Sequence, residues 1–251
     1  MSTATTTPTV LIIGATSAIA TATARCYAAD RARFFLVARS PERLAAIRDD
    51  LLVRGATQVD TYALDLTDLD GHAAMLAAAK AALGRIDATL VAYGTLGNQQ
   101  QSEASVEATL REWHTNATST IALLTLLANE LERQRGGTLA VISSVAGDRG
   151  RRSNYVYGAA KGALSIFLQG LRARLRKAGV RVVTIKPGMV DTPMTAHLRK
   201  GPLFASPERV GRDIYAAMRR GRAVVYTPGY WRLVMFVLRA IPEPIFIRLP
   251  L

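Results

Sequence analysis

Short apolar runs bounded by turn residues alternate along this chain with longer helical patterns. The runs are continuous in Val, Ile and Leu, which is typical of strands buried on both faces of a sheet. Parallel strands need crossover connections, so strands that alternate with helices predict an α/β fold with a parallel sheet. The predicted strands cover residues 9–13, 34–38, 58–63, 88–92, 138–143, 181–185 and 223–226.

The intervening helices are predicted near residues 18–30, 41–54, 68–83, 103–134, 154–178 and 206–220, with 103–134 divided into two. Ser40 and Ser206 each precede Pro-Glu, which places a serine cap and a first-turn proline at two helix starts. No linker divides the 251 residues, so residues 1–251 are expected to form a single doubly wound Rossmann domain of about seven strands. We expect a flexible lead-in over residues 1–8 and an apolar, basic tail over residues 228–251.

The composition excludes several classes of protein. Cys26 is the only cysteine, so neither an internal disulfide nor a cysteine-based metal cluster can form. The three histidines have no ligand spacing, and no metal site is predicted. The sequence shows no signal-peptide pattern and no apolar run near the roughly 20 residues of a membrane-spanning helix, so we expect a cytoplasmic protein.

Charge is distributed unevenly along the chain. The first 132 residues carry a net charge of −4 and the rest carry +17, which gives the formal charge of +13. A basic half attracts a phosphorylated cofactor, an anionic substrate, a membrane surface or nucleic acid. The alternative is a solubilising surface that prefers arginine. No nucleic-acid-binding motif accompanies the charge, so nucleic acid is not expected as a partner.

Ser144, Tyr157 and Lys161 form the pattern with the most chemical content. Tyr157 and Lys161 are four residues apart in a predicted helix and therefore face the same side. A lysine cation beside a tyrosine lowers the pKa of the phenol and brings proton transfer closer to neutral pH. Ser144 follows a predicted strand and is a candidate to hold a substrate oxygen. Tyr155 is not a candidate, because its partner four residues on is Ala159.

The spacing of these residues resembles the short-chain dehydrogenase/reductase family, and the resemblance covers most of the chain. It implies hydride transfer between a nicotinamide cofactor and a carbon that bears oxygen. By this resemblance Ser144 holds the carbonyl oxygen and Tyr157 donates the proton. Lys161 lowers the pKa of Tyr157 and binds the nicotinamide ribose, and Asn116 anchors a proton-relay water. A homodimer or homotetramer is expected.

The turn after the first predicted strand has the context of a dinucleotide-binding turn, with a helix directly behind it. The family pattern Gly-x-x-x-Gly-x-Gly keeps only Gly14, while Ala18 and Ala20 occupy the other two positions. These two alanines are expected to affect the affinity for the cofactor and the geometry of the loop. The cofactor-binding residues predicted in this turn are Gly14, Thr16, Ser17, Ala18 and Ile19.

The ends of the second and third strands are predicted to bind the adenosine half of the cofactor. Ala38 lacks the carboxylate that NAD-preferring enzymes use, whereas Arg39 offers a guanidinium for a 2′-phosphate. We therefore expect NADPH (NADP+) in preference to NAD(H); the alternative is that Arg39 is a surface residue. Asp65 matches the family's adenine-contacting aspartate, with Leu66 beside it, although a helix or turn cap is the alternative.

Two later turns complete the predicted cofactor site. After the fourth strand the family commonly has Asn-Asn-Ala-Gly, whereas this chain has Ala92, Tyr93 and Gly94. Another group must then brace the sheet, and Tyr93 is a candidate to narrow the cofactor or substrate cleft. After the sixth strand a segment resembles the one that closes over the nicotinamide. The residues predicted there are Pro187, Gly188, Val190 and Thr192.

The substrate is expected to contact residues 148–153 and 194–204. The first segment is a basic loop, which is either an anion site or a solvated loop. The tail, residues 228–251, is apolar and aromatic with interspersed arginines, which predicts a helix at a membrane surface or a contact between subunits. With the altered turns, the tail more loosely resembles a subgroup related to decaprenylphosphoryl-2-keto-pentose reductases, which implies a lipid-linked or phosphate-linked keto sugar.

The leading interpretation is an NADPH-dependent reductase of a ketone or keto sugar. One alternative is an NAD-dependent secondary alcohol dehydrogenase. The other is a non-catalytic dinucleotide-binding protein, which would have no need of Ser144, Tyr157 and Lys161 together.

Overall fold

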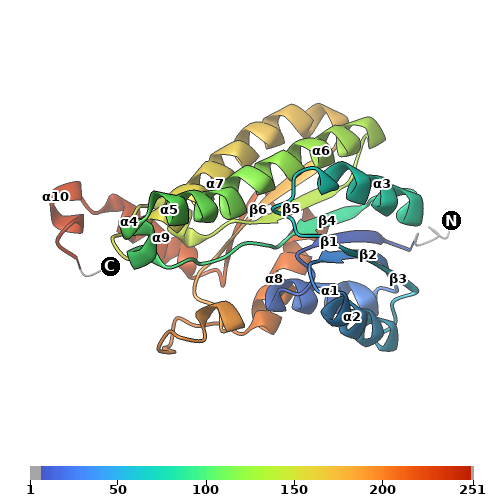
Figure 1. The fold of residues 1–251 in the computed structure, drawn as a ribbon, viewed down its shortest axis with the longest axis horizontal. Coiled ribbons are helices and arrows are strands. Elements are labelled where there is room, and N and C mark those ends of the chain that lie inside the picture. The colour runs from blue at the N-terminus through green and yellow to red at the C-terminus, as the bar shows by residue number, and fades with distance from the viewer. Residues whose placement is uncertain (1–6, 250–251) are drawn as a thin grey trace.

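Seven parallel strands form one sheet in the computed structural model, which describes residues 7–249 (Figure 1). The strand order β3-β2-β1-β4-β5-β6-β7 reverses direction between β1 and β4, as in a doubly wound fold. The strands are β1 (Thr9–Ile13), β2 (Arg33–Ala38), β3 (Gln58–Ala63), β4 (Ala88–Val91), β5 (Thr138–Ile142), β6 (Arg181–Pro187) and β7 (Val224–Thr227). All seven predicted strands are present, and the predicted fold class is confirmed.

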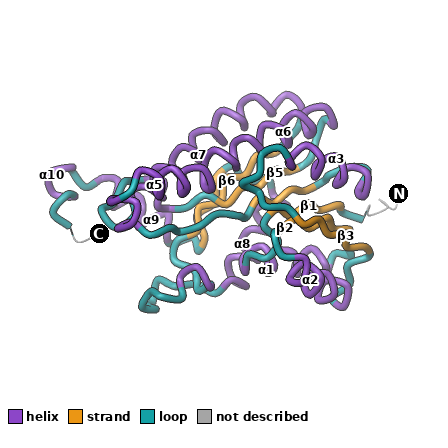
Figure 2. The backbone as a smooth tube through the Cα atoms, in the orientation of Figure 1, coloured by secondary structure: helices purple, strands orange, loops and turns teal. Residues whose placement is uncertain are grey.

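Helices cover both faces of this sheet (Figure 2). One face carries α1 (Ala18–Ala29), α2 (Pro41–Val53) and α8 (Pro207–Arg220), and the other carries α3 (Gly71–Leu83), α6 (Ser119–Gln134) and α7 (Tyr155–Leu175). Strand β1 illustrates why the sequences of the strands are continuously apolar. Val10 and Ile12 pack into the layer of α1, α2 and α8, whereas Leu11 and Ile13 pack into the opposite layer.

The region predicted as two helices over residues 103–134 is interrupted near its middle. Helix α5 (Val106–Trp113) passes through a π-helical turn, His114–Thr118, into α6, and a short helix α4 (Gln99–Ala104) precedes α5. The Ser105 side chain begins α5 by accepting a hydrogen bond from the Ala108 N–H at 3.2 Å. Single π-turns inside helices often occur at functional sites, and this one contains Asn116.

The tail forms helices α9 (Trp231–Ala240) and α10 (Glu243–Phe246), of which α10 stands away from the body of the domain (Figure 1). Trp231 and Met235 on the inner side of α9 are buried against Val145. On the outer side Leu233 and Phe236 are exposed. The two interpretations of this outer side, a lipid surface or another subunit, stay predictions.

Within residues 7–249, the structure has no helix that is both long and apolar enough to cross a membrane. The predicted lead-in falls mostly outside the described residues, and only Thr7 and Pro8 of it are described, both without regular secondary structure.

Candidate active site

The four predicted catalytic residues come from three elements that meet beyond the carboxyl ends of β4 and β5. Ser144 follows β5, Asn116 lies in the π-turn, and Tyr157 and Lys161 lie in α7. This edge of an open α/β sheet, beside the point where strand order reverses, is where such folds bind ligands. The predicted spacing therefore corresponds to one site in space.

Helix α7 approaches the turn after β5 closely because that turn contains Gly147. A methyl group on Gly147 would lie only 2.6 Å from the Gly162 nitrogen on α7. The Ser143 hydroxyl donates to the Lys161 carbonyl at 2.9 Å and fixes α7 from the strand side. Lys161 is 3 % exposed, and its Nζ donates to the Ile142 carbonyl at 3.2 Å.

The pKa of Tyr157 differs from the sequence-based expectation. Burial raises it to about 12, and the hydrogen bond with Ser144 and the positive charge of Arg151 oppose that rise. Lys161 Nζ lies 5.7 Å from the centre of the Tyr157 ring. The prediction that Lys161 lowers the pKa of Tyr157 is wrong for this structure, because removing the phenol from water outweighs the nearby charges.

Lys161 is itself affected by its surroundings. Burial lowers its pKa to about 8, and the negative charge of Glu112 acts in the opposite direction. A buried ammonium group loses hydration that only a nearby anion or oxygen acceptor replaces. Lys161 is therefore a cation at neutral pH but close to its titration range.

Asn116 is fully buried and its side chain is held on both ends. Its Nδ2 donates to the Glu112 carboxylate at 2.7 Å and to the Glu112 carbonyl at 3.2 Å. Its Oδ1 accepts from the Thr95 N–H at 3.3 Å. The sequence analysis did not single out Glu112; its position four residues before Asn116, on the same side of a helix, was the available signal.

The turn at Gly14 fits a dinucleotide. Gly14 has φ +81°, and a methyl group there would lie 2.7 Å from the Tyr93 nitrogen, so the two turns pack backbone to backbone. The Ser17 side chain makes no capping hydrogen bond to α1, which leaves the first N–H groups of that helix for an anion. The Thr16 carbonyl accepts from Arg43 at 3.0 Å, a cation that the sequence analysis did not consider.

Arg39 and Asp65, predicted at the adenosine end, lie next to each other. Arg39 is 77 % exposed, with its guanidinium 3.9 Å from the Asp65 carboxylate. Asp65 also accepts from the Thr67 N–H at 3.0 Å and from the Thr67 hydroxyl at 2.7 Å, which lowers its pKa. Asp65 thus caps a turn, which was the alternative interpretation, and stays close to Arg39. The Leu66 side chain packs into the core, so only its backbone is left for a cofactor contact.

The turn after β4 is braced without the family's asparagines. The Tyr93 hydroxyl lies 2.9 Å from the Ser119 hydroxyl on α6, and the Ala92 N–H donates to the Ile13 carbonyl at 2.8 Å. A methyl group on Gly94 would lie 2.5 Å from Asn116 Oδ1 and 3.3 Å from Lys161 Nζ. Glycine is therefore required where this turn meets the predicted catalytic residues.

The predicted nicotinamide segment is packed against the tail. Pro187 ends β6, and a methyl group on Gly188 would overlap the Trp231 indole at 1.9 Å. Val190 forms a bridge with Ala205, so the intervening segment loops out and returns. At the start of that loop, Thr192 precedes the short 3₁₀ turn Pro193–Thr195. The sequence analysis did not anticipate that the tail reaches this segment.

Asp148 and Arg149 of the basic loop are engaged within the protein, whereas Arg152 and Ser153 are exposed, so neither predicted interpretation describes the whole loop. Asp148 pairs with Lys186 and accepts from the Tyr226 hydroxyl at 2.7 Å. Arg149 donates to the Leu238 and Ile241 carbonyls at 2.6 Å each, at the end of α9. These contacts bind the loop to the tail, because a guanidinium can satisfy several carbonyls at a helix end.

Arg151 differs from its neighbours in this loop. It is half-buried, and its Nε is shielded from solvent without a hydrogen-bond partner in the part of the chain that the structure describes. Burial lowers its pKa, while the charges of Tyr157 and Asp148 act to raise it. Within residues 7–249 no carboxylate forms a salt bridge with it. Arg151 is therefore close enough to Tyr157 and Asp148 to interact electrostatically with both, and it forms no ion pair among the described residues.

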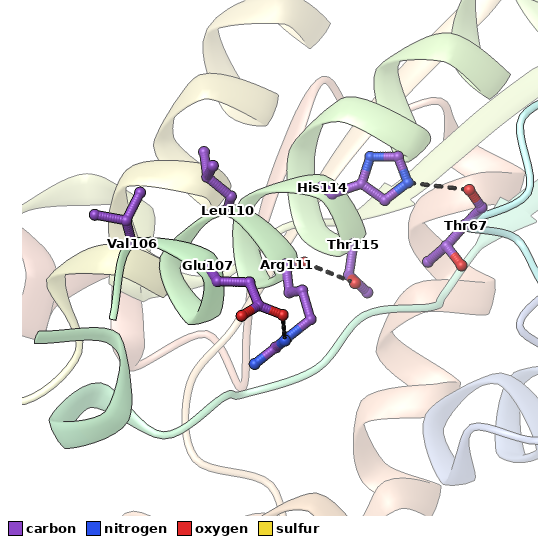
Figure 3. A pocket seen from close by; sticks show the side chains of 7 residues that line it. All are labelled: Thr67, Val106, Glu107, Leu110, Arg111, His114 and Thr115. Atoms are coloured by element: carbon purple, nitrogen blue, oxygen red, sulfur yellow. Dashed lines mark hydrogen bonds and ion pairs between the residues drawn. The ribbon is translucent and has the colours of Figure 1, made fainter. Parts of the chain in front are cut away.

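Two neighbouring cavities flank α5. One of about 680 Å³ is lined by Val106, Leu110 and His114, whose ring nitrogen lies 3.0 Å from the Thr67 carbonyl (Figure 3). Its lining includes none of the predicted catalytic residues. The other, of about 320 Å³, is lined by residues that include Glu112.

Comparison with known proteins assigns the fold and site to a family. Residues 8–202 match the model of the short chain dehydrogenase family. An uncharacterized oxidoreductase of Mycobacterium tuberculosis is 37 % identical over 241 residues, which cover 96 % of each chain. The chain belongs to the short-chain dehydrogenase family. As an oxidoreductase of this family it has the fold of proteins that bind NAD(P).

One further relative and one solved structure of the same fold carry more specific names. Sulfoacetaldehyde reductase 2 of Chromohalobacter salexigens is 32 % identical over 81 % of each chain. A solved structure of an actinorhodin polyketide ketoreductase variant with NADPH superposes with a TM-score of 0.80 at 22 % identity, covering 89 % of this chain and 97 % of that one. Within the described residues of this protein, no group of three or more His, Cys, Asp or Glu side chains is arranged to hold a metal ion.

Proposed function

We propose that this protein is an NADPH-dependent reductase of a ketone or keto-sugar carbonyl, converting it to a secondary alcohol. The observation that carries the proposal is the convergence of Ser144, Tyr157 and Lys161 beside the Gly14 turn. The nicotinamide cofactor, when bound, supplies the hydride. Ser144 holds the carbonyl oxygen, Tyr157 donates its proton to that oxygen, and Lys161 provides the positive charge beside the developing phenolate.

The state of Tyr157 suits the role of proton donor. A phenol with a pKa of about 12 is protonated at neutral pH and is ready to act as an acid. Alcohol oxidation would instead require the phenolate, which is scarce at that pH. In the proposed carbonyl reduction Tyr157 begins as the protonated acid, whereas in an NAD-dependent secondary alcohol dehydrogenase it would begin as the base. A non-catalytic dinucleotide-binding protein has no use for the buried charge of Lys161 beside Tyr157.

Cofactor preference is expected to depend on Arg39. We expect Arg39→Gln to weaken NADPH binding by about tenfold to a hundredfold and to leave NADH binding nearly unchanged, because only NADPH carries the 2′-phosphate. Fluorescence titration with the two cofactors in parallel measures this. Arg48→Gln is the matched control, since Arg48 lies further along α2 in an ion pair with Asp49. Equal weakening of NADPH and NADH binding would show that Arg39 does not bind the 2′-phosphate.

The substrate class follows from Arg151. A half-buried guanidinium that lacks a carboxylate partner suits an anionic group on the substrate, because the ligand then replaces lost hydration. The phosphate of a lipid-linked keto sugar and the sulfonate of sulfoacetaldehyde, which a relative's name gives as its substrate, both have this chemistry. We therefore propose a carbonyl compound with a phosphate, sulfonate or carboxylate near the reacting carbon.

Arg151→Gln is expected to reduce kcat/KM for anionic carbonyl compounds by about tenfold to a hundredfold, which corresponds to one charge-assisted hydrogen bond. Neutral ketones are expected to react at nearly the wild-type rate. The measurement is a paired assay with an anionic ketone and a neutral ketone of similar size. Arg152→Gln serves as the control because Arg152 is an exposed neighbour. A fall of the same size for both substrates would refute an anion contact at Arg151.

A further inference from the structure

Glu112 is a buried carboxylate in a helix whose outer side is exposed. It is only 8 % exposed, whereas Val106 and Leu110 on the same helix are 78 % and 60 % exposed. Its carboxylate accepts from the Thr95 hydroxyl at 2.9 Å and from Asn116 Nδ2 at 2.7 Å. A carboxylate is removed from water only where hydrogen bonds or an opposite charge replace its hydration. Two hydrogen bonds supply part of that replacement.

The opposite charge is Lys161. Asn116 contacts Glu112 through its Nδ2, while its Oδ1 and Lys161 Nζ both lie against the same face of Gly94. Glu112 thus contacts one end of the buried Asn116 amide, and Lys161 Nζ borders Gly94 beside the other end. Burial raises the pKa of Glu112, and Thr95, Lys161 and Asn116 lower it. In turn, Glu112 is the one charged group that raises the pKa of Lys161, against the lowering that burial causes.

Other charged groups around the pair contribute differently. From α7, Tyr157 is protonated at neutral pH and its pKa is raised further by Glu112. Arg111 on α5 forms an ion pair with Glu107 and so carries a local counter-charge. His114, at the end of α5, is directed to the Thr67 carbonyl. Among the described residues, Glu112 is therefore the anion that acts on Lys161.

We propose that Glu112 is a positioning residue and the buried counter-ion that keeps Lys161 positively charged in the site. The proposal rests on the proposed function for its catalytic meaning, since a neutral Lys161 could not stabilise the phenolate of Tyr157. Glu112 also fixes the position of Asn116, because its carboxylate and its backbone carbonyl both accept hydrogen bonds from the Asn116 amide. Glu112 also lines the cavity of about 320 Å³ with Thr95 and Gly97.

The test measures Lys161 directly and needs no substrate. The chain has five lysines, so lysine labelled with ¹³C at Cε gives five signals, and Lys161→Arg identifies one of them. In the wild-type protein Lys161 is expected to titrate near pH 8. In Glu112→Gln, which keeps the shape and most hydrogen bonds, we expect the Lys161 midpoint to fall by about one pH unit.

Glu107→Gln is the matched control, because Glu107 lies on the same helix but is exposed. It should leave the Lys161 midpoint unchanged. An unchanged midpoint in Glu112→Gln would overturn the proposal. If Glu112→Gln does not fold, Lys161→Met tests the same coupling from the other side. Labelled glutamate should then show the Glu112 midpoint raised, since coupling between two sites is reciprocal, and an unchanged Glu112 midpoint would likewise overturn it.

The pH dependence of kcat in Glu112→Gln tests the catalytic role of Glu112 separately from the proposed function. In Glu112→Gln the alkaline limb of the kcat profile should move to lower pH by the same amount, while the rate at low pH stays closer to wild type. A purely structural role for Glu112 would lower the rate equally at every pH. If the wild-type protein reduced no carbonyl compound but the Lys161 midpoint still moved, the counter-ion would stand and the proposed function would fail.

Discussion

Tyr157→Phe is expected to lower kcat for carbonyl reduction by about a thousandfold, while NADPH binding changes little. The variant removes one hydroxyl, and that hydroxyl is the proton donor at the reacting oxygen in the proposed function. Loss of a positioned general acid typically lowers rates by about 10² to 10⁴. NADPH consumption with a panel of anionic ketones measures the rate, and fluorescence titration measures cofactor binding.

Tyr155→Phe provides the control for this prediction. Tyr155 lies two residues earlier on α7 and is 45 % exposed, so removal of its hydroxyl should leave the rate within about twofold. If Tyr157→Phe kept more than about a tenth of the wild-type rate, the proton would have to come from another donor, and Tyr157 would lose the role of acid.

The fold could be predicted from sequence because its dominant signal is local. Each strand of the sheet contributes side chains to both helical layers, as Val10 and Leu11 do from β1, so a continuous apolar run is required at each strand. The positions of Ser144, Tyr157 and Lys161 could be predicted for a similar reason. Helix periodicity and order along the chain determine which side chains meet at the edge of a parallel sheet.

The electrostatics of the site could not be predicted in the same way. Spacing indicated that Lys161 would lower the pKa of Tyr157, but burial by the packed turns dominates and raises it. Desolvation depends on every element that covers a group, and no single motif records it. Glu112 was missed for a related reason: Arg-Glu-Trp in an amphipathic helix is typical of a surface, and only the fold turns that carboxylate inward.

The tail is a third place where the structure differs from the prediction. Its apolar and aromatic composition predicted an external partner, yet part of that composition serves the fold. Trp231 covers Gly188, and Arg149 from the basic loop binds the carbonyls at the end of α9 and stacks on the Phe246 ring at 3.7 Å. Deletion of residues 228–251 would therefore disturb the predicted nicotinamide segment as well as any external contact. Single substitutions separate these two roles.

Trp231→Ala is expected to lower the free energy of unfolding by about 3 kcal/mol, the usual range for loss of a buried tryptophan. The indole is 3 % exposed and packed over Gly188, and its shielded Nε1 makes no hydrogen bond to any described residue, so its contribution is that of packing. Urea denaturation measures this change. Below the unfolding transition NADPH affinity should also fall, because Gly188 loses the surface that fixes its backbone.

Phe236→Ala is the matched control for this prediction, since it truncates an aromatic side chain that is 70 % exposed on the same helix. Its effect on stability should be within about 0.5 kcal/mol. Equal effects of the two substitutions would show that α9 is not anchored through Trp231. A large loss for Trp231→Ala alone would instead mean that the inner side of the tail belongs to the catalytic domain. The outer side, with Phe236, would then be the part available to a partner.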